Sequence, residues 1–201
     1  MDNGDTLYEV IDLTQVRLEL KLDIGPRYGE PSDYLTHYEG TVFSGESLDL
    51  PVGRLSVYIA ELVEAYHDGE DPWEVLDSLN AGVAHFCELI SLHTRRFKPT
   101  VARLVGSDIE RLLIIDHLCI DAPYRGHDLG LNAIDTVCAH LADEAVVVLL
   151  AFPTQWTGRV DENPKAFFAD QMKLKSYYAR SSFVSILSAG SMLRPWLRNS
   201  Y

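Results

Sequence analysis

The chain has 201 residues, a formal net charge of −13 and an apolar fraction of 47%. A chain of this length buries roughly 70% of its unfolded surface, so a single domain with one core is expected. The acidic balance disfavours a nucleic-acid-binding surface, which needs clustered Lys and Arg. It is compatible with a cationic substrate, although solubility alone would also account for it.

The three cysteines occur without a CxxC spacing, and the seven histidines without an HExxH spacing. The sequence therefore predicts neither a disulfide framework nor a metal site, and it favours a reducing compartment. The first ten residues are acidic and lack the pattern of a signal peptide. The longest apolar run, residues 145–152, is too short to span a bilayer. We expect a soluble, cytoplasmic protein that does not contact membranes.

The first half of the chain reads mainly as strands. Apolar and charged residues alternate over residues 13–22, and residues 38–43 and 54–63 are further strand candidates. Asp71-Pro72 is a typical helix start, and apolar residues then recur at spacings of three and four, which predicts one helix to about residue 93. Residues 98–106 are ambiguous and include a short-strand alternative.

The second half alternates between strand and helix. Arg111–Ile120 predicts a strand, residues 129–142 a helix, and residues 145–152 a strand buried on both faces. Together they predict a β-α-β unit with a right-handed crossover. Residues 163–178 predict a further helix, and residues 183–187 a last strand.

The most informative segment joins the strand Arg111–Ile120 to the helix that follows it. A short Pro-containing turn leads into Arg125-Gly126-His127-Asp128-Leu129-Gly130. Strand, glycine-bearing loop and helix in this order place backbone N–H groups and a helix N-terminus where they can hold a phosphate.

This segment resembles the acyl-CoA loop of the GNAT superfamily of N-acetyltransferases. The family pattern is an apolar strand end, a Pro turn, and then Arg/Gln-x-x-Gly-x-Gly/Ala. Further along, Leu174-Lys-Ser-Tyr177-Tyr178-Ala-Arg-Ser-Ser182-Phe183 is similar to the family's later Leu-x-x-aromatic-Tyr-x-x-x-Gly-Phe segment. The resemblance covers residues 110–187. It implies an α/β (α+β) fold in which helices flank a mixed, splayed central sheet.

The resemblance also implies an organisation of the chain. Residues 1–201 would form a single acyl-CoA N-acyltransferase-like domain. Residues 1–106 would be a strand-rich half with a helical insertion at about 71–95, and residues 107–201 would bind the cofactor. Acetyl-CoA would be the cosubstrate, with its pantetheine arm between two splayed strands. The implied cofactor residues are Leu118, Cys119, Ile120, Arg125, Gly126, His127, Asp128, Leu129, Gly130 and Leu131.

Two catalytic residues follow from the same resemblance. Tyr178 matches the family's general acid, which protonates the thiolate of CoA, while Tyr177 would point elsewhere on the helix. Asp116 is the candidate base, favoured slightly over His117. Strand alternation would allow only one of these two to face the substrate and would place Asp116 on the face of Leu118 and Ile120. Cys119 is interpreted as a small apolar filler, because no neighbour in sequence would lower its pKa.

The chain departs from the family pattern at Asp128, where the family has Gly, and more mildly at Ser182. Asp tolerates a positive φ, but its carboxylate would repel a pyrophosphate. It would also cap the helix and occupy the N–H groups that CoA needs. Two functions therefore stay open. One is an N-acetyltransferase acting on a primary amine of a small molecule or protein, and the acidic composition is compatible with a cationic acceptor. The other is a non-catalytic CoA-binding or protein-interaction module with an impaired pyrophosphate loop. A homodimer is compatible with either.

Overall fold

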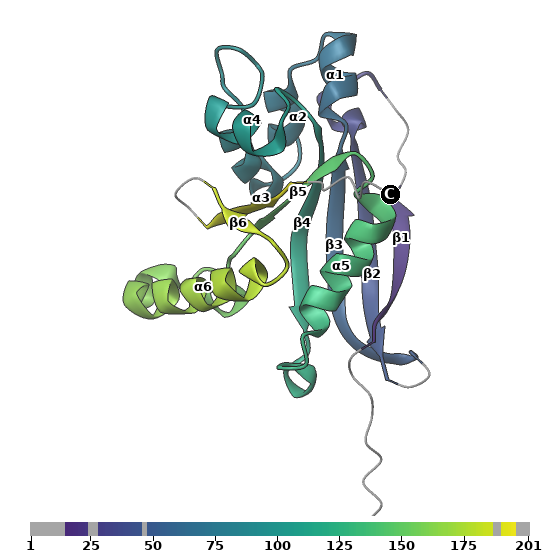
Figure 1. Cartoon of the computed structure of the whole chain (residues 1–201), viewed down its shortest axis with the longest axis vertical. Helices are drawn as coiled ribbons and strands as arrows, with labels where there is room; N and C mark the ends of the chain where they lie inside the picture. The colour runs from purple at the N-terminus through teal and green to yellow at the C-terminus, as the bar shows by residue number, and fades with distance from the viewer. Residues whose placement is uncertain (1–14, 24–27, 46–47, 187–189, 196–201) are drawn as a thin grey trace, which may run out of the picture.

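The computed structural model describes residues 15–23, 28–45, 48–186 and 190–195. Its centre is a mixed seven-stranded sheet in the order β1-β2-β3-β4-β5-β7-β6 (Figure 1). Only the pair β4–β5 is parallel. The strands are β1 (Arg17–Asp23), β2 (Leu35–Ser44), β3 (Leu50–Ala60), β4 (Arg111–Ile120), β5 (Ala145–Leu150), β6 (Val184–Ser185) and β7 (Ser191–Arg194). Both halves of the chain thus contribute to one sheet, and the mixed α/β class is confirmed.

The predicted β-α-β unit is present. Helix α5 (Leu129–Leu141) connects β4 to β5 and lies across one face of the sheet (Figure 1). Strand β5 is buried along nearly its whole length, as its uninterrupted apolar run predicts. The predicted helix near residues 163–178 is α6 (Pro164–Ala179), which begins where the Asn163 side chain accepts a hydrogen bond from the Ala166 amide.

Local start and stop signals correct three predictions in the first half. Strand β3 ends at Ala60, because helix α1 (Leu62–Asp68) begins two residues later and closes at Gly69 with φ +90°. The ambiguous residues 98–106 form a helix and not a strand. This helix, α4 (Pro99–Val105), has Pro at its first position and left-handed Gly106 after its last.

The single helix predicted after Asp71 is also wrong, because the segment is divided. Asp71 does cap α2 (Pro72–Asp77) by accepting from the Trp73 amide. The side chain of Asn80 then accepts from two amides and starts a second short helix, α3 (Ala81–Ala84), followed by a 3-10 turn. Leu79, one of the apolar residues that gave the helical spacing after Asp71, lies at the break and is 42% exposed.

The C-terminal part contains a strand that the sequence did not predict. Residues 184–185 form β6 within the predicted segment, whereas Leu187 lies outside the described residues. Strand β7 follows and inserts between β5 and β6, so β6 is not the last strand. At the other end, residues 13 and 14 of the first predicted strand lie outside the described residues.

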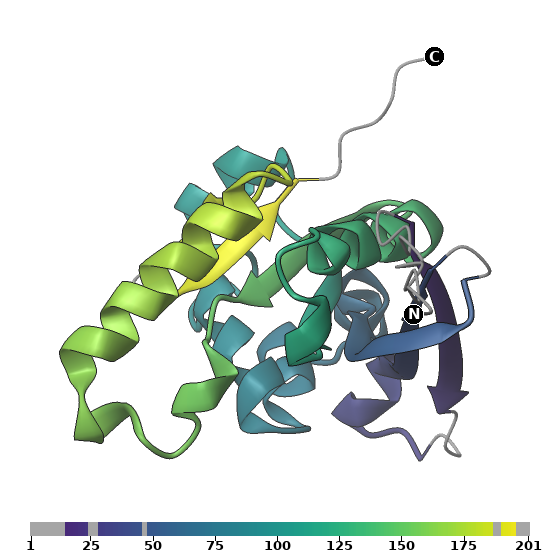
Figure 2. The ribbon, with the colours of Figure 1, turned by 90° about the horizontal axis from the view of Figure 1, so that it is seen from below.

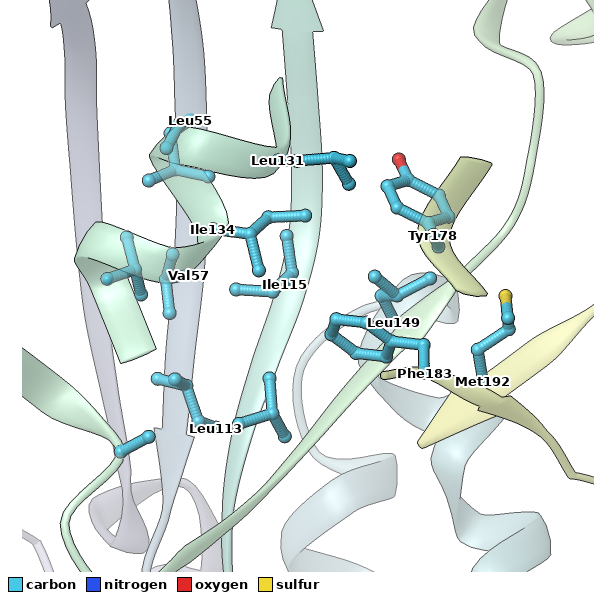
Figure 3. Close-up of a cluster of buried hydrophobic side chains, with 14 of the residues drawn as sticks. Leu55, Val57, Leu113, Ile115, Leu131, Ile134, Leu149, Tyr178, Phe183 and Met192 are labelled. Atoms are coloured by element: carbon cyan, nitrogen blue, oxygen red, sulfur yellow. The ribbon is translucent and has the colours of Figure 1, made fainter. Parts of the chain in front are cut away.

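Two apolar clusters cover the two faces of the sheet. The first packs α5 and the end of α6 against the sheet, with Leu131 and Ile134 near Val57 and Ile115 (Figure 3). The second packs α1 to α4 against the other face of the sheet (Figures 1 and 2). In the described part of the chain, no helix is long and apolar enough to cross a membrane.

Candidate functional site

A pocket of about 410 Å³ lies between the ends of β4 and β5. Four segments that are distant in sequence form its walls: the end of β4, the loop into α5, the segment after β5, and α6. The lining residues are Leu118, Cys119, Ile120, Tyr124, Arg125, Gly126, Asp128, Leu129, Gly130, Phe152, Pro153, Thr154, Gln155, Asp170, Lys173, Leu174, Tyr177 and Tyr178.

The pocket opens because β4 is longer than its partner on one side. The parallel pairing of β4 with β5 ends at Ile115↔Leu149, whereas β4 stays paired with β3 as far as Gly53↔Ile120. The last residues of β4 therefore pair on one edge and face the pocket with the other. Cys119 is in this stretch, and its sulfur lies 4.0 Å from the Ile120 carbonyl oxygen.

The loop after β4 is organised by Arg125. Its Nε donates to the carbonyl oxygen of Ile120 at 2.8 Å, which ties the loop to the strand end. Gly126 has φ +88°, a conformation that favours glycine. The backbone N–H groups of Gly126, His127 and Asp128 donate to no acceptor in the described part of the chain. Those of Gly126 and Asp128, two residues that line the pocket, are therefore available to a ligand there.

Asp128 adopts the positive φ expected of it, +57°, but it does not cap α5 with its side chain. The predicted competition with CoA for the helix amides through Asp128 is therefore wrong. Instead, the carboxylate is paired with Arg180, which follows α6, and Nη1 donates to Oδ1 at 2.8 Å. The hydrogen bonds from Arg180 hold the pKa of Asp128 below its usual range.

A different residue occupies the N-terminus of α5. The hydroxyl oxygen of Tyr177 accepts a hydrogen bond from the Leu131 amide at 3.1 Å. Gly130 permits this approach, because a Cβ atom there would lie 3.0 Å from the Tyr177 oxygen. The prediction that Tyr177 points away from the site is wrong, since Tyr177 and Tyr178 both line the pocket.

Tyr178 is buried in the first apolar cluster, where its ring packs against Phe183 (Figure 3). Burial raises the pKa of its phenol well above the ordinary value. The phenol therefore carries its proton throughout the physiological pH range. A protonated phenol that reaches into a pocket is able to donate a proton there.

Asp116 does not line the pocket, because a β-bulge interrupts the alternation of side chains along β4. Ser56 pairs with His117 but Val57 pairs with Ile115, so Asp116 is the extra residue. The prediction that Asp116 shares a face with Leu118 and Ile120 is therefore wrong. Those two pack with the first cluster, whereas the Asp116 carboxylate touches Gly82 of α3, whose neighbour Val83 belongs to the second.

The surroundings of Asp116 are polar and aromatic. Burial raises the pKa of this carboxyl, while the nearby His117 and His37 oppose the rise. Asp116 makes no hydrogen bond or ion pair with any described residue. His37 stacks on Tyr58 with ring centroids 4.3 Å apart, and its Nε2 lies 3.0 Å from Ser56 Oγ. A half-buried carboxylate without a partner is suited to accept a proton or bind a cation.

Eight of the ten predicted cofactor residues line the pocket, and His127 and Leu131 do not. Tyr178 lines it, but Asp116 does not. Sequence reasoning missed the wall formed by residues 152–155 and the polar face of α6. Trp156 Nε1 donates to Asp170 at 3.0 Å, and Lys173 Nζ donates to the same carboxylate at 2.9 Å, so the loop and the helix are joined there. The i,i+3 spacing of Asp170 and Lys173 was the available signal.

No group of three or more His, Cys, Asp or Glu side chains suited to a metal ion occurs among the described residues. No protein-family model matches the sequence, and no curated protein matches it.

Proposed function

We propose that this chain is an acetyl-CoA-dependent N-acetyltransferase acting on a primary amine of a small molecule or protein. The observation that carries the proposal is the pocket at the open edge of β4, which continues into a glycine-bearing loop at the N-terminus of α5. The motif resemblance supports it independently. A splayed sheet is part of the proposal, and the end of β4 that extends past its pairing with β5 supports it.

The residues of the pocket fit the phosphates of CoA. Three successive amides, from Gly126 to Asp128, are unoccupied in the described part of the chain and precede a thirteen-residue helix. The charge of Asp128 is balanced by Arg180, and Arg125 and Lys173 are the cations of the lining, Lys173 being paired with Asp170. These groups would hold a pyrophosphate, and the free edge of Leu118–Ile120 would bind the amide groups of the pantetheine arm.

When bound, acetyl-CoA would supply an activated acetyl thioester. The chain contributes proton transfers on either side of this group. Tyr178 holds the proton that the leaving sulfur needs, since burial keeps its phenol neutral. Asp116 accepts the proton of the acceptor amine, which would approach from the α3 face of the sheet. The excess of acidic residues favours a cationic acceptor.

A non-catalytic CoA-binding or interaction module is the second candidate. Two observations favour it. Tyr177 already occupies the Leu131 amide, and Asp128 already occupies Arg180, so part of the anion-binding capacity is used internally. Asp116 also does not line the pocket that contains Tyr178.

Calorimetric titration with acetyl-CoA, followed by a thiol-release assay over a set of primary amines, tests the proposal. We expect micromolar binding and acetyl-CoA-dependent thiol release that requires an amine. Binding without release for any amine would favour the non-catalytic module. Absence of acetyl-CoA binding by folded protein would overturn the acetyltransferase and leave the protein-interaction module as the remaining candidate. Tyr28→Phe, at an exposed tyrosine outside the pocket, is the matched control for the tyrosine variants below.

A further inference from the structure

The ion pair between Asp128 and Arg180 joins the two motifs across 52 positions of sequence. Asp128 lines the pocket immediately before α5, and Arg180 directly follows the last residue of α6. The guanidinium uses two of its nitrogens on the two carboxylate oxygens. It also lies 5.8 Å from the ring centroid of Tyr177, another residue of the pocket wall.

A guanidinium binds a carboxylate and a phosphate with the same two-pronged geometry. The Asp128 carboxylate therefore occupies the two nitrogens with which Arg180, beside the pocket, would bind a phosphate. Both side chains are partly exposed, at 41% and 56%, so the pair is accessible to solvent and to a ligand. Pairs of this kind are weak, because water screens them, and a dianionic phosphate competes well with a single carboxylate.

We propose that Arg180 is a phosphate-binding residue of this pocket and that Asp128 is its internal competitor. A phosphate of the ligand takes over Arg180 as the carboxylate releases it. The inference rests on the proposed function for the identity of the ligand, a CoA thioester. The part of the inference that does not depend on the proposed function is that the pocket binds a diphosphate through Arg180 and that Asp128 opposes this binding. Asp128 thus weakens binding through Arg180 and not by capping the helix.

Four proteins test the competition in a double-mutant cycle: the native chain, Asp128→Asn, Arg180→Gln and the double variant. Calorimetry with coenzyme A gives each affinity, and adenosine diphosphate serves as a second probe without the pantetheine arm. Asp135→Asn is the matched control. Asp135 lies within α5 and pairs with an arginine, Arg194, at 2.6 Å, and unlike Asp128 it does not line the pocket.

We expect Asp128→Asn to tighten the binding of both probes by about fivefold, the size of an exposed charge interaction. Arg180→Gln should weaken binding by about the same factor, and Arg180→Lys should restore part of the loss. The decisive result is the double variant: without Arg180, Asp128→Asn should change the affinity by much less than it does in the native chain. Asp135→Asn should bind like the native protein.

Three outcomes would overturn the inference. If Asp128→Asn weakens binding while its thermal unfolding is unchanged, Asp128 serves the ligand directly. If it tightens binding equally with and without Arg180, the carboxylate acts by general repulsion alone. If no variant binds either probe, the pocket is not a diphosphate site.

The inference and the proposed function fail in distinguishable ways. If the protein transfers acetyl groups but its affinity for coenzyme A does not depend on Arg180, the proposed function stands and the inference fails. If adenosine diphosphate binds in a way that depends on Arg180 but no acetyl transfer occurs, the inference stands and the proposed function fails.

Discussion

The hydroxyl oxygen of Tyr177 accepts a hydrogen bond from the backbone amide of Leu131, at 3.1 Å. The first amides of an α-helix have no partner within the helix, and here a side chain from α6 satisfies one of them. This amide is one of the N-terminal donors of α5, the kind of group that would otherwise be free to bind a phosphate at that helix end. One tyrosine therefore stabilises the unliganded pocket and occupies a donor of the proposed site.

Tyr177→Phe should separate these two roles. Loss of the hydroxyl leaves the Leu131 amide without a protein acceptor, so the free energy of unfolding should fall by about 1 kcal/mol. Affinity for coenzyme A should rise, because the amide no longer needs to be released. Urea denaturation and calorimetry measure the two effects. Weaker binding by a fully folded variant would mean that the hydroxyl contacts the ligand itself.

Tyr178→Phe tests the proposed general acid. We expect the affinity for acetyl-CoA to stay within twofold, while kcat falls by about a hundredfold, the usual contribution of acid catalysis. Steady-state kinetics against Tyr28→Phe provide the comparison. A native-like kcat would show that Tyr178 serves only in packing, to which its contact with Phe183 already contributes.

Asp116→Asn should lower kcat and yet stabilise the fold at neutral pH. Burial raises the pKa of Asp116, so the native state binds its proton more tightly than the unfolded chain does. The contribution of this group to stability is therefore present below the ordinary pKa of Asp and is lost as the pH rises through the raised value. The neutral amide avoids that loss.

Two measurements check the Asp116 prediction. Denaturation at several pH values should show the stability advantage of the variant growing as the pH rises above the ordinary pKa of Asp. If the proposed function holds, the native chain should show a pH–rate profile with an ascending limb from Asp116, and the variant should lose it. An unchanged kcat with a retained limb would remove Asp116 as the base and favour His117 or an ordered water.

The protein should lose stability in alkali. Burial raises the pKa of the Cys87 thiol to about 12 and that of Cys138 to about 11 from an ordinary value of 9.0. Above about pH 9 the unfolded chain releases these protons while the native chain keeps them, so stability falls as pH rises. The loss has a limiting slope of about 1.4 kcal/mol per pH unit for each thiol.

Urea denaturation between about pH 8 and pH 11 measures this slope. In Cys138→Ala, the free energy of unfolding should fall less steeply with pH than in the native chain, because one of the two thiols is gone. Equal slopes for the two proteins would contradict the assignment of the effect to Cys138.

The sequence alone was sufficient where the signals are local. Asp71 and Asn163 cap helices because a short polar side chain reaches amides two or three residues ahead, whatever the rest of the fold does. The strand–loop–helix unit around Gly126 could be predicted for the same reason, since its glycine, its apolar strand and its periodic helix are contiguous. All ten predicted cofactor residues come from this unit.

Tertiary structure decided whatever depends on partners far along the chain. The bulge at Asp116 arises from how β4 pairs with β3, and a shift of one residue moves a side chain to the other face. The ion pair of Asp128 with Arg180 and the bond of Tyr177 to Leu131 require α6 to lie beside the start of α5. Periodicity within one segment carries no information about such contacts, so the sequence predicted the glycine-bearing loop and the helix after it but not the residues of α6 and beyond that contact them.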